Sequence, residues 1–200
     1  FFVFVSRIEH PSKNHVGLID AFALLKRQGL PHQLVLAGAD RERAEEVHEH
    51  ARRSGCADDI LFLGFVTDET LLMLYRAAES LVFPSRFEGF GIPVIEAMAC
   101  GAPVLCSNAS SLPEVAGDAA IYFDPLSPAS IGEAMLRVAR SAALRAEFSE
   151  RSLRRAAEFS IEITARRTLE VIVQAGSRSP GGPKTGPAPC TCRAGPCSRG

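Results

Sequence analysis

The segment RFEGFGIPVIEAMACG, residues 86–101, contains residue types that could bind a nucleotide. Gly89 and Gly91 let the backbone bend and approach a ligand closely, and the proline that follows suits the first turn of a helix. A helix that begins here offers N–H groups and a partial positive charge to an anion. The amides near Phe90, Gly91 and Ile92 could therefore hold a phosphate.

Two carboxylates flank this turn. Glu96 lies about one turn into the predicted helix, where a carboxylate can accept hydrogen bonds from the two hydroxyls of a ribose. Its surroundings, IPVIEAMA, are apolar, so we expect a buried acid with a partner. Glu88 precedes the turn and would lie nearer the other end of the ligand. The alternative is that Glu88 is a solvated loop acid and that Glu96 only stabilises the helix dipole.

The segment SRIEHPSKN, residues 6–14, places Arg7 and Lys13 after the first predicted strand. An arginine can bind a diphosphate through two parallel hydrogen bonds, and a lysine can bind it as a point charge. The alternative interpretation is a pair of ordinary surface cations. The position after a strand favours the diphosphate.

The elements that must position these residues alternate between apolar runs and amphipathic stretches. Strands are predicted at residues 1–6, 32–38, 59–65, 80–85, 103–107 and 120–124. Helices are predicted at 15–29, 40–55, 67–78, within the motif at 86–101, and from about 128 to about 175, with a turn or short helix at 111–117. Short apolar strands separated by helices indicate an α/β domain with a doubly wound, Rossmann-like parallel sheet. Such sheets bind ligands beyond the carboxyl ends of their strands.

Composition limits the function. The 200 residues, 46% hydrophobic, suffice for one α/β domain or half of a larger enzyme. The formal charge of -1 predicts no nucleic-acid partner. No apolar run approaches the roughly 20 residues that a membrane span requires. The opening FFVFV is typical of a strand, so we expect either a preceding domain or a fragment.

The chain changes character after residue 175. Residues 176–200 are rich in glycine and proline and are predicted to be a disordered tail. Its CTCRAGPC segment could suggest a metal clip, but it lacks the usual ligand set, and we predict no metal site. Cys56, Cys100 and Cys106 are expected to be buried, reduced thiols of a cytosolic protein.

The segments SRIEHPSKN, LGFV, FPSRFEGFGIPVIEAMACGAPVLCSN and LPEVAGDAAIYFDP together resemble the C-terminal, nucleotide-binding domain of family 4 retaining glycosyltransferases, which have the GT-B fold. The resemblance covers about residues 1–175. The family's motif has two glutamates separated by seven residues, as Glu88 and Glu96 are. Ser6 is a departure, because the family usually has glycine before the arginine.

The resemblance implies a role for each matching residue. Arg7 and Lys13 would bind the donor diphosphate, Glu88 would lie near the donor sugar and its phosphate, and Glu96 would bind the ribose. Backbone contacts to sugar and phosphate would come from Phe90, Gly91 and Ile92. Backbone contacts to the base would come from Phe65 and Val66.

The resemblance also implies an activity. A hexosyl group would pass, with retained configuration, from a UDP-, GDP- or ADP-sugar to the hydroxyl of a glycan, lipid-linked or small-molecule acceptor, in glycan or polysaccharide biosynthesis. No metal would be required. The family's N-terminal domain, which carries the acceptor site and a catalytic histidine, is absent, so the isolated chain is expected to be inactive. The expected location is cytoplasmic, with the missing domain able to hold the enzyme at the inner membrane face.

Two other functions stay open at this point. A sugar-nucleotide epimerase of related fold would use similar phosphate contacts but would not transfer sugar to an acceptor. A non-catalytic nucleotide-binding module would bind without turnover. Turnover by a full-length protein distinguishes these possibilities.

Overall fold

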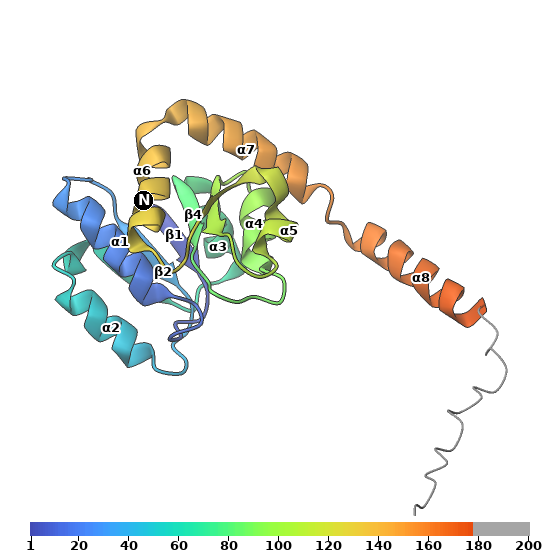
Figure 1. Ribbon diagram of the computed structural model, residues 1–200, viewed down its shortest axis with the longest axis horizontal. Helices are drawn as coiled ribbons and strands as arrows, with labels where there is room; N and C mark the ends of the chain where they lie inside the picture. Colours follow the sequence, from blue (N-terminus) through green and yellow to red (C-terminus); the bar gives the residue numbers. More distant parts are fainter. Residues whose placement is uncertain (178–200) are drawn as a thin grey trace, which may run out of the picture. The chain divides into compact units, whose positions relative to one another are not determined.

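The computed structural model describes residues 1–177 (Figure 1). It contains a parallel sheet of six strands in the order β3-β2-β1-β4-β5-β6. The predicted doubly wound α/β fold is confirmed. Each predicted strand is present, in a shorter form than predicted. The strands are β1 (Phe2–Val5), β2 (Leu34–Ala37), β3 (Ile60–Gly64), β4 (Ser80–Phe83), β5 (Val104–Ser107) and β6 (Ala120–Phe123).

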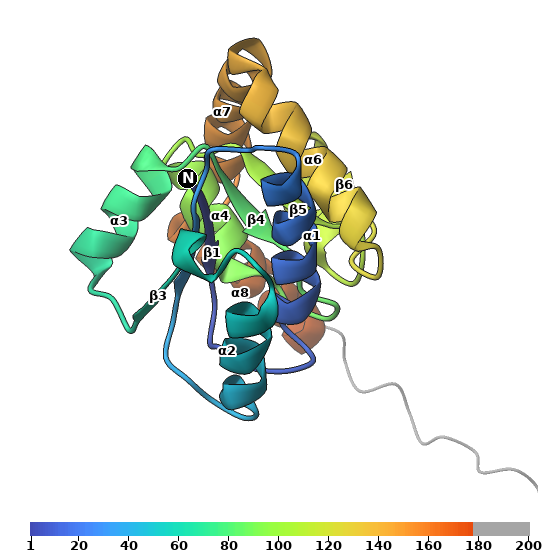
Figure 2. The ribbon, with the colours of Figure 1, turned by 90° about the vertical axis from the view of Figure 1, so that its left-hand side faces the viewer.

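Helices cover both faces of the sheet. They are α1 (His15–Arg27), α2 (Ala44–Arg53), α3 (Asp68–Ala77), α4 (Ile92–Ala99), α5 (Leu112–Ala116), α6 (Pro128–Arg140) and α7 (Ala142–Ala156), with short 3-10 turns at Ala57–Asp59 and Gly117–Ala119. A further helix, α8 (Ile161–Ser177), belongs to a separate unit of the chain. Figure 2 shows α1, α2 and α6 on one face and α3 and α4 on the other. The α1 helix packs against α6, and α4 packs against α7.

The sheet forms because its central strands are apolar on both sides. All of β2, β4 and β5 is buried, as expected for parallel strands covered by helices on two faces. The pairing of Val3 with Val35 and with Leu81 joins β2, β1 and β4 in register. Phe4 of β1 meets Phe83 of β4 edge to face, with ring centroids 5.5 Å apart.

Several helix ends follow local rules. Thr67 caps α3, since its side chain accepts a hydrogen bond from the N–H of Thr70. Gly29, with φ 82°, follows the end of α1. The helical stretches predicted from about 128 to 175 correspond to α6, α7 and α8. Ser141 is extended at φ -129°, and its side chain accepts a hydrogen bond from Leu144 N–H to begin α7.

Two units are described separately, residues 1–159 and the segment from residue 160 onward. In the second, the Ser160 hydroxyl accepts a hydrogen bond from Ile163 N–H and caps α8. The α8 helix extends two residues into the predicted tail, to Ser177, and the other tail residues lie outside the described part of the chain. Within residues 1–177, no helix has both the length and the apolar character of a membrane span.

The strand order creates a switch point between β1 and β4. From β1 the chain continues outward to β2 and β3, whereas from β4 it continues in the opposite direction to β5 and β6. The loops after β1 and β4 therefore diverge from adjacent strands, and the carboxyl edge between them, called the crevice below, is the place where such sheets bind ligands. Both predicted binding segments, residues 6–14 and 86–101, begin at this crevice.

Candidate functional site

The loops after β1 and β4 are joined by an ion pair between Lys13 and Glu88. Lys13 Nζ lies 2.8 Å from Glu88 Oε1, and the two side chains are only 15% and 13% exposed. The structure thus brings together two of the predicted site residues, which are 75 positions apart in the sequence. An ammonium group has three donors, so a lysine that is bonded to one carboxylate oxygen can still donate to a phosphate.

Arg7 projects from the start of the same first loop. Its side chain is 61% exposed, and its guanidinium lies 3.3 Å from a carboxylate oxygen of Glu9. A hydrogen bond from the Ser12 hydroxyl lowers the pKa of Glu9, which therefore stays ionised beside Arg7. Arg7 remains accessible to an anion in solution.

The N-terminus of α4 has the geometry expected of the glycine motif. Gly91 has φ 95°, which strains other residues, and a Cβ atom added there would lie 2.6 Å from Leu112 Cδ2 and would displace that side chain. Phe90 and Ile92 on either side are 46% and 61% exposed. Their N–H groups and that of Gly91 have no acceptor within residues 1–177, which leaves three donors at the start of α4.

Two serines before α5 support the Glu88 loop from the side of β5. Ser110 Oγ accepts a hydrogen bond from Glu88 N–H at 3.2 Å and donates to Glu88 O at 2.7 Å. Ser111 Oγ donates to Glu88 O and Phe90 O, at 3.1 and 3.2 Å. The backbone on both sides of Gly89 is thereby fixed. Neither serine was predicted, because nothing near them in the sequence indicates this long-range contact.

Glu96 is exposed, so the prediction of a buried acid is wrong. The apolar residues around it bury other faces of α4, through Val94, Ala97 and Met98. Glu96 nevertheless has a partner, because the Tyr75 hydroxyl donates to Glu96 Oε2 at 3.2 Å. Burial raises the pKa of Tyr75, which keeps its hydroxyl protonated as a donor. Tyr75 escaped the sequence analysis because α3 showed only an amphipathic pattern.

Phe65 and Val66, predicted near the base, follow β3 at the same edge of the sheet. Phe65 is 83% exposed. The structure assigns neither residue a contact with Lys13, Glu88 or Glu96, so their role stays a prediction. The link is indirect, because the helix that follows them, α3, supplies Tyr75 to Glu96.

Asn14 ties three loops together at the crevice and was also missed. It is 1% exposed, and its Nδ2 donates to Pro84 O at 3.1 Å and to Pro125 O at 2.7 Å. Its Oδ1 accepts from Arg86 Nε and NH2, at 3.3 and 3.1 Å. An asparagine before a helix is typical of a cap, and nothing in the local sequence indicates these tertiary partners.

Histidines and cysteines supply no metal cluster in the described chain. Within residues 1–177, no group of three or more His, Cys, Asp or Glu side chains could hold a metal ion. His48 and His50 pair with Asp40 and Asp20 at 3.0 and 2.7 Å. Cys56 and Cys106 are buried free thiols as expected, whereas Cys100 is partly exposed.

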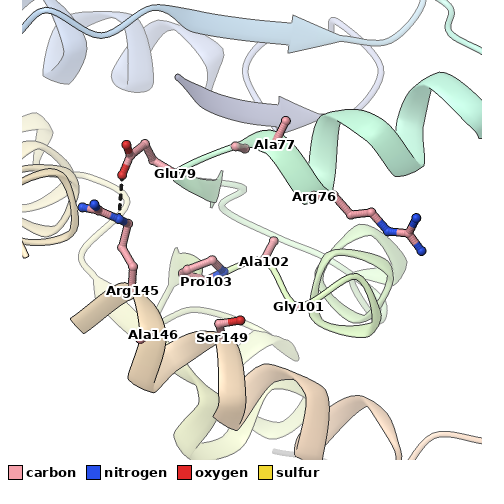
Figure 3. A pocket seen from close by; sticks show the side chains of 10 residues that line it. Arg76, Ala77, Glu79, Gly101, Ala102, Pro103, Arg145, Ala146 and Ser149 are labelled. Carbon is pink, nitrogen blue, oxygen red and sulfur yellow. Dashed lines mark ion pairs between the residues drawn. The ribbon is translucent and has the colours of Figure 1, made fainter. Parts of the chain in front are cut away.

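A cavity of about 300 Å³ lies at the opposite, amino edge of β4 and β5 (Figure 3). Figure 3 shows Glu79 and Arg145 facing one another, and Arg145 Nε lies 2.9 Å from Glu79 Oε2. Arg76 points away from this pair. The two arginines of this cavity therefore do not converge on one point.

Comparison with known proteins gives a consistent result. The family model described as "Glycosyl transferases group 1" matches residues 1–155. O-antigen chain mannosyltransferase B of Escherichia coli is 38% identical over 160 residues, which make up 80% of this chain and 42% of that protein. Serotype-specific mannosyltransferase WbdA of Escherichia coli is 36% identical over 173 residues, 85% of this chain and 21% of that protein.

Solved structures share the fold. Sucrose-phosphate synthase from Thermosynechococcus elongatus superposes with a TM-score of 0.78 and 25% identity, over 89% of this chain and 46% of that one. Anabaena Alr3699/HepE, solved in complex with UDP and glucose, gives a TM-score of 0.73 and 22% identity over 88% and 48%. The expected GT-B type of fold is confirmed. The chain spans less than half the length of all four proteins.

His15 provides a pH test of the crevice. Burial lowers its pKa from 6.5 to about 4. The unfolded chain therefore binds a proton at a higher pH than the folded chain does. The free energy of unfolding should decrease as the pH falls from 6.5 towards 4, by up to about 3 kcal/mol for this group.

Urea unfolding measured across this pH range should show that the free energy of unfolding of the His15→Gln variant changes less steeply with pH than that of the original protein. Burial also lowers the pKa of His10 and His32, so a smaller slope of the same sign should remain. If the stability of the His15→Gln variant falls with pH as steeply as that of the original protein, the lowered pKa of His15 is contradicted.

Proposed function

Because the chain belongs to the glycosyl transferases group 1 family, we propose that it is the donor-nucleotide-binding part of a glycosyltransferase that uses a nucleoside diphosphate sugar. The observation that carries this proposal is the Lys13–Glu88 ion pair at the switch point, with Arg7 on the same loop and the α4 N-terminus beside Glu88. Cations and free helix amides together suit a diphosphate. The mannosyltransferase relatives support a role in polysaccharide biosynthesis.

In this proposal, different site residues contact different parts of the nucleotide sugar. Arg7 and Lys13 bind the diphosphate, and the amides of Phe90, Gly91 and Ile92 contact phosphate and sugar. Glu96, oriented by Tyr75, accepts the ribose hydroxyls. Phe65 and Val66 border the base. Glu88 holds Lys13 in place and lies on the side of the transferred sugar.

In the proposed reaction, the bond between the anomeric carbon and the phosphate oxygen breaks, and a new bond forms to an acceptor hydroxyl oxygen. The acceptor proton passes to the leaving phosphate, and the sugar keeps its anomeric configuration. Arg7, Lys13 and the α4 dipole stabilise the charge that develops on the diphosphate, so no metal is needed for that purpose. Glu88 orients groups in this scheme and is not a covalent nucleophile.

The whole enzyme's acceptor and location are also part of the proposal. A glycan, lipid-linked or small-molecule acceptor would be bound by the part of the relatives that this chain does not span. We propose a cytoplasmic enzyme. The described chain binds the donor nucleotide but does not transfer sugar, because transfer requires the acceptor to be positioned against the donor.

Replacing Arg7 or Lys13 by alanine tests the proposed function. Each change should weaken binding of UDP, GDP or ADP, whichever the chain prefers, by about 1.5–3 kcal/mol, because a charge-assisted hydrogen bond to phosphate is lost. Binding of the matching nucleoside should change far less. Isothermal titration calorimetry measures both affinities.

Lys26→Ala is the matched control. Lys26 also pairs with an acid, Asp59, at 2.9 Å, but it lies in the last turn of α1, away from the crevice. This variant should bind diphosphate as the original chain does. Equal losses of nucleoside and diphosphate affinity in the Arg7 and Lys13 variants would reject the assignment.

Glu96→Gln tests the ribose contact. The change should weaken the binding of a ribonucleoside diphosphate more than the binding of its 2′,3′-dideoxy analogue, since the analogue lacks the hydroxyls that Glu96 would contact. Tyr75→Phe should change the ratio of ribonucleotide affinity to dideoxynucleotide affinity by a smaller factor, because it removes only the hydroxyl that orients Glu96.

Tyr122→Phe removes another tyrosine hydroxyl, one bonded to the Gly117 carbonyl oxygen, and should leave the ratio unchanged. If Glu96→Gln lowers affinity for both ligands by the same factor, Glu96 has a structural role instead.

A further inference from the structure

We propose that Asn14 is the positioning residue of the diphosphate site: it sets the direction of Lys13 and the separation of the loops after β1 and β4. This inference rests on the proposed function, because it concerns how the same site is held ready. Asn14 itself is 1% exposed and is not offered to a ligand.

The first support is the set of partners of the Asn14 amide. Its Nδ2 donates to the carbonyl of Pro84, which follows β4 and begins the Glu88 loop, and to the carbonyl of Pro125, which follows β6. Its Oδ1 accepts from Arg86, also in the Glu88 loop. One side chain thus satisfies buried groups from two other loops, and a second bond between the loops runs from Arg86 N–H to Ser12 O at 3.0 Å.

The second support is that Asn14 gives up its expected local role. It precedes α1 at the N-cap position, yet its side chain makes no cap hydrogen bond. Its backbone is left-handed, with φ 60°, a conformation that asparagine tolerates better than most residues. The side chain is therefore committed to the neighbouring loops, and the backbone turn at Asn14 fixes where the adjacent Lys13 points.

The third support is Gly17, one turn into α1. A Cβ atom added at Gly17 would lie 2.7 Å from Asn14 Oδ1 and 3.0 Å from Asn14 Nδ2. Gly17 thus leaves the space that the Asn14 amide fills. Because alanine otherwise favours a helix interior over glycine, the glycine here serves the position of Asn14 rather than the stability of α1.

The consequence concerns the ion pair. Lys13 and Glu88 come from the two loops that the Asn14 side chain joins. Without the hydrogen bonds of Asn14, the two loops can move relative to each other, and Lys13 and Glu88 can move apart. The diphosphate would then bind to a Lys13 that is no longer held beside Glu88 and the start of α4, and it would bear the cost of ordering that lysine. Nucleoside affinity should be insensitive, because the ribose and base contacts lie on α4 and after β3.

Two variants of the 200-residue chain, Asn14→Gly and Gly17→Ala, test the proposal. Asn14→Gly keeps the left-handed backbone and removes the three-loop clamp, whereas Gly17→Ala displaces the clamp without changing Asn14. Each should weaken UDP, GDP or ADP binding about tenfold, the scale of one charge-assisted hydrogen bond, with less than about a twofold change for the nucleoside. Gly132→Ala is the matched control, because its Cβ atom would meet Ala21 O at an ordinary 3.5 Å.

A structural role alone would lower the melting temperature and leave the ratio of nucleoside to diphosphate affinity unchanged, and that result overturns the proposal. Unchanged or tighter diphosphate binding also overturns it. If the original chain shows no preference for a diphosphate over its nucleoside, the proposed function fails instead. Should neither variant fold, the side-chain amide NMR signal of Asn14 in the original chain decides: whichever of UDP, GDP and ADP binds must shift this signal, and a nucleotide-bound chain in which the signal is unmoved contradicts the proposal.

Discussion

The low exposure of the Lys13–Glu88 ion pair is the constraint on which the rest of the site depends. Two charges that are 15% and 13% exposed must stay within hydrogen-bonding distance of each other, since a buried charge without a partner is costly. Lys13 and Glu88 belong to loops that leave adjacent strands in a sheet whose order reverses between β1 and β4. The pair therefore fixes the two walls of the crevice relative to each other.

Other features of the carboxyl edge support this arrangement. Asn14 joins the two loops from below the surface, and Ser110 and Ser111 hold the backbone of the Glu88 loop from the side of β5. Gly38 at the end of β2 allows the chain to pass close to the first loop, because a Cβ atom there would lie 1.8 Å from Ser6 O. The cations and the α4 N–H groups are thus arranged before any ligand arrives, which lowers the cost of binding an anion.

Much of the fold could be predicted from the sequence because the signals are local. Apolar runs bounded by glycine and amphipathic stretches indicate strands and helices, and Thr67 caps α3 through a neighbour three residues away. The chemical types of Arg7, Lys13, Glu88 and Glu96 likewise indicate a nucleotide site. The resemblance to a family specified the roles that residue type alone left open.

The remaining features depend on contacts between distant segments. The Lys13–Glu88 pairing, the Tyr75–Glu96 hydrogen bond and the carbonyl partners of Asn14 each join different elements, and no local pattern encodes them. Glu96 was expected to be buried because its neighbours are apolar, but a short helix can bury those neighbours on its other faces.

The central claim is that a nucleoside diphosphate binds at the carboxyl edge between β1 and β4 without a metal. Backbone amide NMR of the chain, titrated with UDP, GDP and ADP in the presence of EDTA, tests this claim most directly. At least one of these ligands should shift the amide signals of residues 6–14 and 86–96 and leave those around Arg76 and Arg145 unchanged. Shifts centred on Arg76 and Arg145, or no shift with any of the three ligands, would contradict the account.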